Sequence, residues 1–298
     1  MNAPFPAPRA ARALQHSLCL WADGARRDLP WRRTRDPWAV LVSELMLQQT
    51  QVSRVVPRYQ AFLDRFPTPA AAASSPLAEV VRAWAGLGYN RRAVNLHRAA
   101  GEIVGRHAGR FPDTLEELVA LPGVGQYTAR TVLAFAYEVD VGVVEVNSAR
   151  VLARAAAGRP LEAREAQALA DSLVPEGDGW AWNQAILDLG ATVCTKTAPR
   201  CGDCPLRACC AWLAAGASVG DPAVGSAGCG GRQSTFTGSD RQGRGRLVDA
   251  LRLAPVSLDR LAEAAGWPGD PERARRAAAG LVADGLAVAD EHVLRLPG

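Results

Sequence analysis

The chain has 298 residues, of which 48% are hydrophobic and 21% charged, and its formal net charge is +4. This length and composition are typical of a soluble globular protein with two modest domains and an appendage. No apolar run is long enough to span a bilayer, and the opening MNAPFPAPRAAR lacks the apolar core of a secretion signal, which predicts a cytoplasmic protein without a membrane partner. Lys196 is the only lysine, so nearly all of the 34 basic residues are arginines. Arginine can bind phosphate in bidentate fashion, although the bias is equally well explained by genome composition.

Apolar residues recur at spacings near three and four along most of the chain, which predicts a mostly helical fold. Pro, Gly, Asn and Asp separate the helical segments. The predicted helices are 13–24, 38–56, 76–85, 91–107, 114–120, 126–138, 148–157, 161–173 and 180–190. No alternating pattern typical of a strand occurs before the C-terminal end.

The two ends of the chain differ from this helical middle. Residues 1–12 are predicted to be a disordered tail, and the Gly, Ser and Ala content of 213–240 predicts a flexible linker. Residues 241–298 carry three short helical patterns and then LAVADEHVLRL, which fits a two-stranded wing. This order predicts a small winged-helix-like module. Its nine arginines against eight acids give it no strong electrostatic footprint for DNA.

Five of the seven cysteines fall in CTKTAPRCGDCPLRACC, residues 194–210. Disulfides are rare in the cytoplasm, so this clustering indicates a metal site. Four of these cysteines follow the pattern C-x6-C-x2-C-x5-C, whose thiolates can hold an iron-sulfur cubane or a tetrahedral zinc ion. They are Cys194, Cys201, Cys204 and Cys210. Cys209 is the spare candidate, with a packed thiol as the alternative.

Two helical segments carry further candidates. In LPGVGQYTA, residues 121–129, Gly123 and Gly125 predict a tight hairpin between helices. The N-terminus of the second helix would then offer backbone N–H groups to a phosphate, unless the segment is merely a compact turn. In PWAVLVSELMLQQTQV, residues 37–52, Glu44 lies within an apolar helix, where the ordinary reading is a solvated glutamate. Three glutamines follow it, and amides can hydrogen-bond base edges.

Glu145 is the least expected charged residue. In VVEVNSARVLAR, residues 143–154, it stands in an apolar run just ahead of a helix predicted to begin near Ser148. A buried carboxylate is costly unless it is compensated, and the positive end of a helix dipole favours its ionised form. The alternatives are a catalytic anion and a residue that caps the helix or pairs with Arg150.

Together these motifs resemble the helix-hairpin-helix DNA glycosylases of base excision repair, and among them most of all the MutY-type adenine DNA glycosylases. The resemblance covers residues 13–212, and the joint occurrence of the motifs is far more specific than any one of them. The matching segments are LPWR (29–32), SELMLQQTQV (43–52), GLGYNRRAVNL (86–96), LPGVGQYTAR (121–130), NQAILDLGATVC (183–194) and the cysteine pattern.

The resemblance implies an all-α, two-lobed fold with a [4Fe-4S] cluster on the four cysteines. Residues 13–36 and 141–212 would form the cluster lobe, and 37–140 a six-helix lobe containing the helix-hairpin-helix. The cluster loop also holds three cations suited to phosphates, so folding of this loop and binding to DNA are the contributions expected of the cluster. These cations are Lys196, Arg200 and Arg207.

The resemblance also implies catalytic roles. Glu44 matches the general acid that protonates the adenine ring, and Asn147 matches an asparagine of the site. Glu145 falls where the family has an aspartate that stabilises the oxocarbenium-like sugar. Tyr127 occupies the position at which lysine marks enzymes that also cut the strand, which implies a monofunctional enzyme.

Further residues match the family's contacts to the substrate. The residues that resemble the pocket around the extruded adenine are Trp31, Arg32, Gln184 and Asp188. Gln48 and Tyr89 resemble the pair inserted into the helix gap, and Gln49, Gly123 and Gly125 complete the expected DNA contacts. Reaching the base requires flipping it out of the stack.

The function expected from the resemblance is hydrolysis of the N-glycosidic bond of adenine opposite 8-oxoguanine or guanine in double-stranded DNA, by a monomer associated with the nucleoid. The chemistry needs a proton for the departing base and a negative charge near the sugar cation, hence two carboxylates in different environments.

Two departures from the family keep alternatives open. A glutamate at position 145 moves the carboxylate by about a bond length, and misplacement by about 1 Å can cost roughly a hundredfold in rate. Only 58 residues follow the linker, too few for the usual domain that reads 8-oxoguanine. The alternatives are a mismatch thymine or uracil glycosylase and a catalytically altered iron-sulfur DNA-binding protein. A glycosylase-lyase is disfavoured because lysine is absent from position 127.

Overall fold

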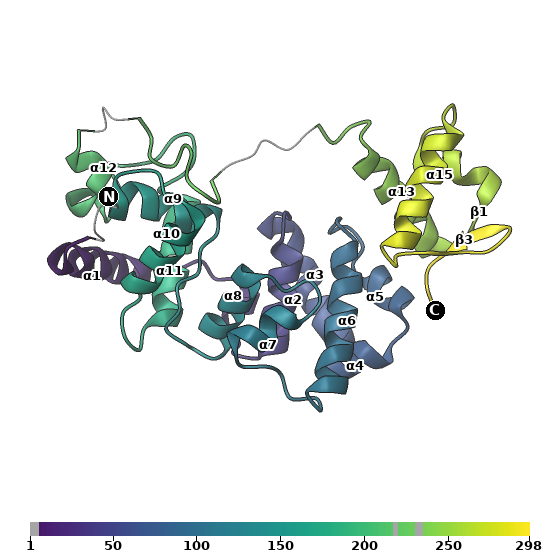
Figure 1. Cartoon of the computed structure of the whole chain (residues 1–298), viewed down its shortest axis with the longest axis horizontal. Coiled ribbons are helices and arrows are strands. Elements are labelled where there is room, and N and C mark those ends of the chain that lie inside the picture. Colours follow the sequence, from purple (N-terminus) through teal and green to yellow (C-terminus); the bar gives the residue numbers. More distant parts are fainter. Residues whose placement is uncertain (1–5, 217–219, 230–234) are drawn as a thin grey trace. The chain divides into compact units, whose positions relative to one another are not determined.

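The computed structural model describes residues 6–216, 220–229 and 235–298, and the chain divides into two compact units (Figure 1). Unit 1 comprises Met1–Arg35 and Gln126–Arg232, and unit 2 comprises Asp36–Gly125 and Gln233–Gly298. Among the described residues, no helix is long and apolar enough to cross a membrane.

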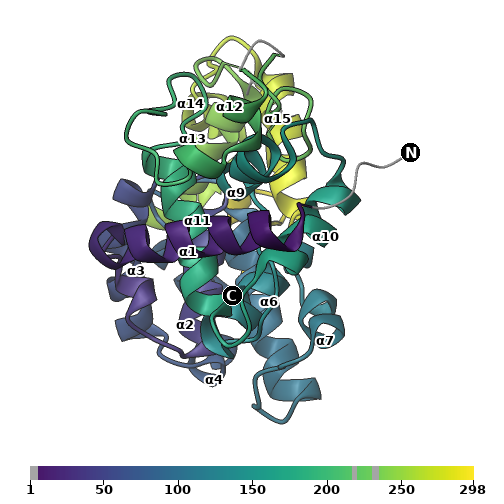
Figure 2. The same ribbon diagram turned by 90° about the vertical axis from the view of Figure 1, so that its left-hand side faces the viewer.

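Unit 1 is helical and is built around α11. Helix α1 contributes Leu14 and Leu18 to its core, and α11 lies against both α1 and α9; in Figure 2, α1 crosses in front of α11. Gly190 allows the close approach of α11 to α9, because a Cβ at this position would lie 2.6 Å from the carbonyl oxygen of Asn147. The elements are α1 (Pro8–Ala25), the 3-10 helix η1 (Pro30–Arg32), α8 (Gln126–Ala136), α9 (Val146–Val151), the π-helix η2 (Leu152–Ala157), α10 (Ala163–Leu173), α11 (Gly179–Thr192), the 3-10 helix η3 (Arg207–Cys209) and α12 (Ala211–Ala214).

Unit 2 begins with helices packed around α6, which contacts α2, α4 and α5. The Asp36 side chain caps α2 by accepting from the backbone N–H groups of Trp38 and Ala39, and Pro37 fits the first helical position. These helices are α2 (Pro37–Leu47), α3 (Val52–Arg65), α4 (Pro69–Ser74), α5 (Leu77–Ala83), α6 (Arg91–Arg106) and α7 (Leu115–Ala120).

The C-terminal part of unit 2 contains a small antiparallel sheet of order β1-β3-β2. Helix α13 contacts α5, and the Arg252 guanidinium of α13 donates to the Val81 carbonyl and the Asn90 side chain. This part therefore packs on the first helices of its unit. Its elements are α13 (Asp240–Leu253), β1 (Val256–Ser257), η4 (Leu258–Arg260), α14 (Leu261–Ala265), α15 (Pro271–Ala283), β2 (Val288–Ala289) and β3 (Val293–Arg295).

The mostly helical prediction is confirmed, but several elements differ from those predicted. The helix predicted over 38–56 is two helices, because Gln48 leaves the helical conformation with ψ 110° and Gln49 adopts a positive φ of 55°. Helix α3 continues to Arg65, and α4 was not predicted. Helix α1 begins at Pro8, so residues 8–12 of the predicted tail are helical, whereas residues 1–5 lie outside the described part. The sheet has a third strand, β1, besides the predicted pair.

The domain limits also differ from those predicted. Helix α8 groups with unit 1, so the helix-hairpin-helix contributes α7 to one unit and α8 to the other, and residues 241–298 group with unit 2. Within the predicted linker, residues 220–229 form turns in which Ala223 and Ser226 are buried. Residues 217–219 and 230–234 of that linker lie outside the described residues.

Candidate active site and cysteine cavity

Glu44 is a buried carboxylate of unit 2. It lies in the largely apolar α2, between the turns of Leu41 and Leu45, and only 5% of the residue is exposed. The capped and rigid α2 fixes its backbone. The interpretation of a solvated glutamate is therefore wrong, because the helix is buried on every side over this stretch.

Two loops of unit 2 contain residues in the left-handed region. Gln49, after α2, has φ 55°, and Tyr89, before α6, has φ 44° and is 39% exposed. A positive φ is unfavourable for residues other than glycine, and such conformations persist where the surroundings impose them. Both residues were expected to contact DNA.

Arg92 imposes the conformation of both loops. It is 6% exposed, and burial lowers its pKa to about 10. Its Nη1 donates to three carbonyl oxygens at the end of α2, at 2.6–2.8 Å, while Nη2 and Nε hold the loop before α6. One guanidinium thereby ties the two loops together. The acceptors are the carbonyl oxygens of Leu45, Met46, Gln48, Leu87, Gly88 and Tyr89 and the hydroxyl of Thr50.

The predicted hairpin turn lies between α7 and α8. Thr114 caps α7 with its side chain, and Gly123 has φ +79°. A Cβ at Gly123 would lie 2.6 Å from the Cβ of Asn95, so this position needs glycine for space as well as for conformation. Tyr127 lies in the first turn of α8 and is half-buried.

Glu145 is the N-cap of α9 in unit 1. Its Oε1 accepts from the backbone N–H groups of Asn147 at 2.8 Å and Ser148 at 3.3 Å, and the Ser148 hydroxyl accepts from the Glu145 N–H at 2.9 Å. Its Oε2 accepts from the Asn147 amide at 3.3 Å. These bonds form a capping box, so the carboxylate is oriented by its own turn. Glu145 therefore caps α9, and this cap does not decide whether it also acts in catalysis.

Burial raises the pKa of Glu145, and the hydrogen bonds from Asn147 and Ser148 oppose this rise without cancelling it. The direction is opposite to that expected from the helix dipole alone. Desolvation of the carboxylate therefore outweighs the cap and the charge of Arg150.

Arg150 links this turn to the first cysteine of the pattern. It is 4% exposed, its Nε donates to the Cys194 carbonyl at 2.6 Å, and its Nη2 donates to the Asn147 side-chain oxygen at 2.7 Å and to the Gly190 carbonyl at 2.6 Å. Its bonds therefore orient Asn147, and they do not form the ion pair with Glu145 that was one alternative.

The predicted pocket residues of unit 1 lie on η1 and α11. Trp31, Arg32, Gln184 and Asp188 are at most 9% exposed. Arg32 binds Asp188 in bidentate fashion, at 2.6 and 2.8 Å, and Arg27 binds the same carboxylate at 2.5 Å. Burial disfavours the Asp188 anion, but the bonds and charges of the two arginines outweigh it and lower its pKa. Asp188 thus positions Arg32.

The four patterned cysteines line one cavity of unit 1. Cys194, Cys201, Cys204 and Cys210 share its wall with apolar residues of α11 and α12, whereas Cys209 is absent from that wall. Burial raises the pKa of Cys204 to about 11. Among the described residues, no three His, Cys, Asp or Glu side chains are placed to hold a single metal ion. A cavity lined by four cysteine thiols has the donors for an iron-sulfur cubane or a tetrahedral zinc ion.

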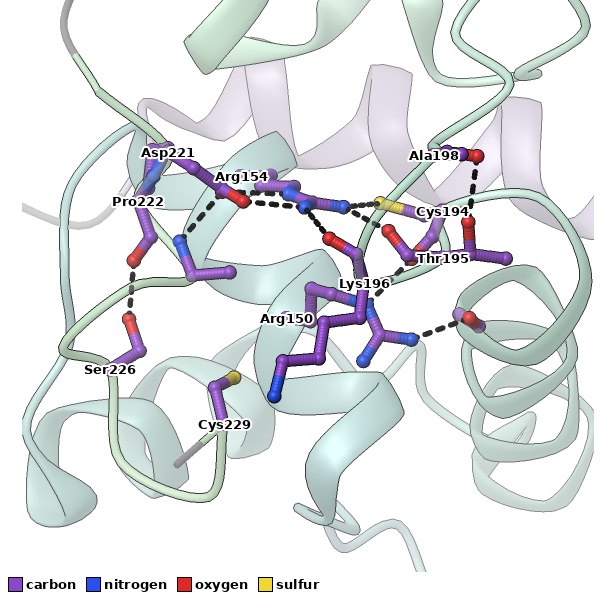
Figure 3. A network of polar contacts seen from close by, with 12 residues as sticks. Arg150, Arg154, Cys194, Thr195, Lys196, Ala198, Asp221, Pro222, Ser226 and Cys229 are labelled. Carbon is purple, nitrogen blue, oxygen red and sulfur yellow. Dashed lines mark hydrogen bonds and ion pairs between the residues drawn. The ribbon is translucent and has the colours of Figure 1, made fainter. Parts of the chain in front are cut away.

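Arg154 lines this cavity and bonds to both Cys194 and Asp221 (Figure 3). It lies in η2, is 2% exposed, and donates to Cys194 Sγ at 3.4 Å and to the Thr195 carbonyl at 2.8 Å. Its charge is paired with Asp221 at 2.6 Å.

The site residues fall into two sets. Unit 2 holds Glu44, Gln48, Gln49, Tyr89, Gly123 and Gly125, and unit 1 holds all the others, including Glu145, Asn147 and the cysteines. No sequence pattern pointed to the arginines that orient these residues. They are the half-buried Arg27 and the buried Arg92 and Arg154, together with Arg150 in its orienting role. In a chain with so many arginines, no sequence signal separates buried from exposed ones.

The fold and the sequence are those of a DNA repair class. Residues 42–176 match the HhH-GPD superfamily base excision DNA repair protein. A solved thermostable thymine-DNA glycosylase is similar with a TM-score of 0.64 and 26% identity, over 70% of this chain and 98% of that one. A non-covalent endonuclease III–DNA complex has the same fold, with a TM-score of 0.62 and 21% identity over 71% and 98% of the two chains.

Curated relatives narrow this class. An adenine DNA glycosylase of Mycolicibacterium smegmatis is 44% identical over 90% of both chains, and one of Mycobacterium tuberculosis is 43% identical over 95% of this chain and 93% of its own. The human adenine DNA glycosylase is 42% identical over 66% of this chain and 39% of its own length. The chain therefore belongs to the adenine DNA glycosylase family of the HhH-GPD superfamily.

Proposed function

We propose that this protein is a monofunctional DNA glycosylase that removes adenine mispaired with 8-oxoguanine or guanine from double-stranded DNA and leaves an abasic site. The observation that carries the proposal is its near end-to-end match to relatives named adenine DNA glycosylase. The mycobacterial relatives have about the same length, so the short C-terminal part does not argue against this activity.

Glu44 is the proposed general acid. It is buried in the apolar α2, and as the acid it would give its proton to the adenine ring. The bond between the base and the sugar carbon then breaks, both electrons leave with the protonated base, and the base departs neutral.

Glu145 is the proposed anion for the sugar. Its carboxylate would stabilise the oxocarbenium-like sugar while water attacks the same carbon and loses a proton, which completes the hydrolysis. Asn147 donates to Oε2 of Glu145 and is itself held by Arg150, so it keeps the carboxylate in place. In this proposal Glu44 and Glu145 act on one flipped nucleotide.

Tyr127 supports a hydrolytic enzyme without lyase activity, because a tyrosine cannot form a Schiff base. Lys196, the only lysine, belongs to the cysteine loop. Borohydride should therefore trap no covalent adduct with DNA, and a trapped adduct would contradict the monofunctional assignment.

The proposed contacts to DNA come from both sets of site residues. The proposed adenine pocket consists of Trp31, Arg32, Gln184 and Asp188, with Arg32 presented by its bidentate pair. Gln48 and Tyr89 would fill the gap left by the flipped base, assisted by Gln49. The turn with Gly123 and Gly125 would bind a phosphate through the N-terminus of α8.

We also propose a [4Fe-4S] cluster held by Cys194, Cys201, Cys204 and Cys210. The common cavity of the four cysteines supports a site for a metal or cluster, and the choice of a [4Fe-4S] cluster over zinc rests on the resemblance to the family. When bound, the cluster cross-links the loop that carries Arg200 and Arg207, cations suited to DNA phosphates. It has no proposed part in the chemistry.

The order helix, strand, two helices, two strands over residues 240–295 supports a winged-helix-like module. A monomer acting on chromosomal DNA at the nucleoid is the proposed working form.

Single-turnover assays on defined duplexes test the function. Duplexes carry A, T or U opposite guanine or 8-oxoguanine, and the abasic site is located by alkaline cleavage. We expect cleavage in the strand that carried adenine. Cleavage at T or U favours a mismatch glycosylase, the second candidate, which the similarity to a thymine-DNA glycosylase supports. Binding without cleavage of any strand favours a catalytically altered iron-sulfur DNA-binding protein. The observation behind this alternative is that Glu145 stands where the family has an aspartate.

A further inference from the structure

Residues 220–229, which we call the strap, are hydrogen-bonded to unit 1 beside the cysteine cavity (Figure 3). The backbone N–H of Leu161 donates to the Ser226 hydroxyl at 3.0 Å, and the N–H of Ala227 donates to the Leu161 carbonyl at 2.9 Å. Ser226 is 5% exposed and also donates to the Pro222 carbonyl. These contacts give a glycine- and alanine-rich segment a defined position on the unit.

Asp221 is the charged end of the strap. Its two oxygens bind Arg154 in bidentate fashion, Oδ1 to Nε at 2.8 Å and Oδ2 to Nη2 at 2.6 Å. A bidentate pair fixes both the position and the plane of a guanidinium. Because Arg154 is 2% exposed, its charge needs this carboxylate, since a buried charge without a partner is strongly destabilising.

The free edge of the same guanidinium faces the cysteine loop. Nη1 of Arg154 donates to Cys194 Sγ at 3.4 Å and to the Thr195 carbonyl, and Nη2 reaches the Lys196 carbonyl at 3.2 Å. Trp212, which lines the cavity, stacks on Arg154 at 5.2 Å. Arg154 therefore bridges Asp221 and Cys194, a candidate cluster ligand.

We propose that the strap is a clamp for the iron-sulfur cluster, in which Asp221 is a positioning residue that holds Arg154 on Cys194. This inference rests on the proposed [4Fe-4S] cofactor. Partners behind a metal ligand orient it and tune its affinity, and hydrogen bonds to cluster sulfurs tune the electronic properties of the cluster. Loss of Asp221 frees Arg154 from its plane and leaves its charge buried, which weakens the hold on the loop.

The test follows the visible absorbance of the cluster in the full-length protein during incubation with an iron chelator. Asp221→Asn should bind the cluster roughly 10-fold to 100-fold more weakly and lose it correspondingly faster, the range typical of partners behind metal ligands. Asp221→Glu should retain most of the stability. The matched control is Asp203→Asn, which removes the same charge from an exposed side chain within the cysteine loop. Equal loss rates for Asp221→Asn and wild type would overturn the clamp.

A spectroscopic readout separates positioning from general loosening. Visible circular dichroism reports the surroundings of the cluster sulfurs, so the spectrum of the remaining cluster should change in Asp221→Asn and not in Asp203→Asn. An unchanged spectrum would mean that Asp221 does not act through Cys194. If Asp221→Asn fails to fold, Ser226→Ala loosens the strap without changing charge and should also lose the cluster faster, and retention at the wild-type rate would contradict the proposal.

Two measurements on the wild type keep this inference apart from the proposed function. Iron and sulfide analysis tests the cofactor, and protein without either would overturn the cluster and the clamp together. Adenine excision by the same preparation tests the glycosylase. Cluster-containing protein that excises adenine, but in which Asp221→Asn has no effect on the cluster, refutes the clamp alone.

Discussion

The two units hold their candidate catalytic carboxylates in different ways. Glu44 lies in the middle of α2, in an apolar helix whose position is set by packing. Glu145 lies at the first turn of α9 and receives hydrogen bonds from the backbone of that turn and from Asn147. The proposed acid thus lies in an apolar helix and the proposed anion among hydrogen-bond donors, although burial still raises the pKa of Glu145.

The buried arginines Arg92 and Arg154 also differ in the partners that compensate their charge. Arg92 of unit 2 bonds to carbonyl and hydroxyl oxygens of two nearby loops, and burial lowers its pKa. Arg154 of unit 1 is opposed by the same burial, but Asp221 and Cys194 outweigh it and raise its pKa. Arg92 therefore orders two loops with neutral acceptors, whereas Arg154 has a counter-ion 67 residues away.

Removing the proposed acid should have the largest effect. Glu44→Gln keeps the shape of the side chain but cannot give up the proton, so single-turnover excision of adenine opposite 8-oxoguanine should fall by roughly 10²- to 10⁴-fold. The matched control is Glu102→Gln in α6, which should excise at the wild-type rate. Undiminished activity of Glu44→Gln would remove the mechanism.

Arg92→Ala should cost stability on the order of 3 kcal/mol, because it leaves several buried carbonyl oxygens without donors. Urea unfolding measures this loss, and binding to mismatched DNA should weaken as the Gln49 and Tyr89 loops relax. Arg91→Ala is the control, since it removes the same charge from the neighbouring exposed position. Equal stability of the two variants would show that Arg92 does not order the loops.

Glu145→Asp tests whether the longer side chain limits catalysis. If the family's aspartate is the better anion, this change should raise the excision rate, by up to about a hundredfold. Single-turnover rates at saturating enzyme isolate this step from DNA binding. A slower Glu145→Asp variant would mean that the site is built around the glutamate.

The pH dependence should be the smallest effect. Burial raises the pKa of Glu145, so its active anion is lost on acidification at a higher pH than an ordinary glutamate, whose pKa is about 4.3. The folded state then binds more protons than the unfolded chain in this range, and this group's contribution to stability falls as pH rises through it. Asn147→Ala removes one donor to Glu145 and should move the acid limb of the rate profile further up. An acid limb at the ordinary value in both proteins would contradict this account.

Much of the site could be predicted from sequence because its signals are local. Cysteine spacing found the four residues of one cavity, and helical periodicity found most helices of both units. The break at Gln48 was missed because apolar spacing continues across it into α3. The strap was missed because its composition is that of a linker, and its contact between Asp221 and Arg154 joins positions that no short-range pattern connects.

The central claim is that Glu44 and Glu145 serve one reaction on one nucleotide, and a double-mutant cycle tests it most directly. Single-turnover excision of adenine is measured for Glu44→Gln, Glu145→Gln and the double variant. Groups that act as a unit give grossly non-additive losses, so we predict a double variant about as slow as the slower single variant. Losses that multiply, or a single variant with wild-type activity, would contradict the claim.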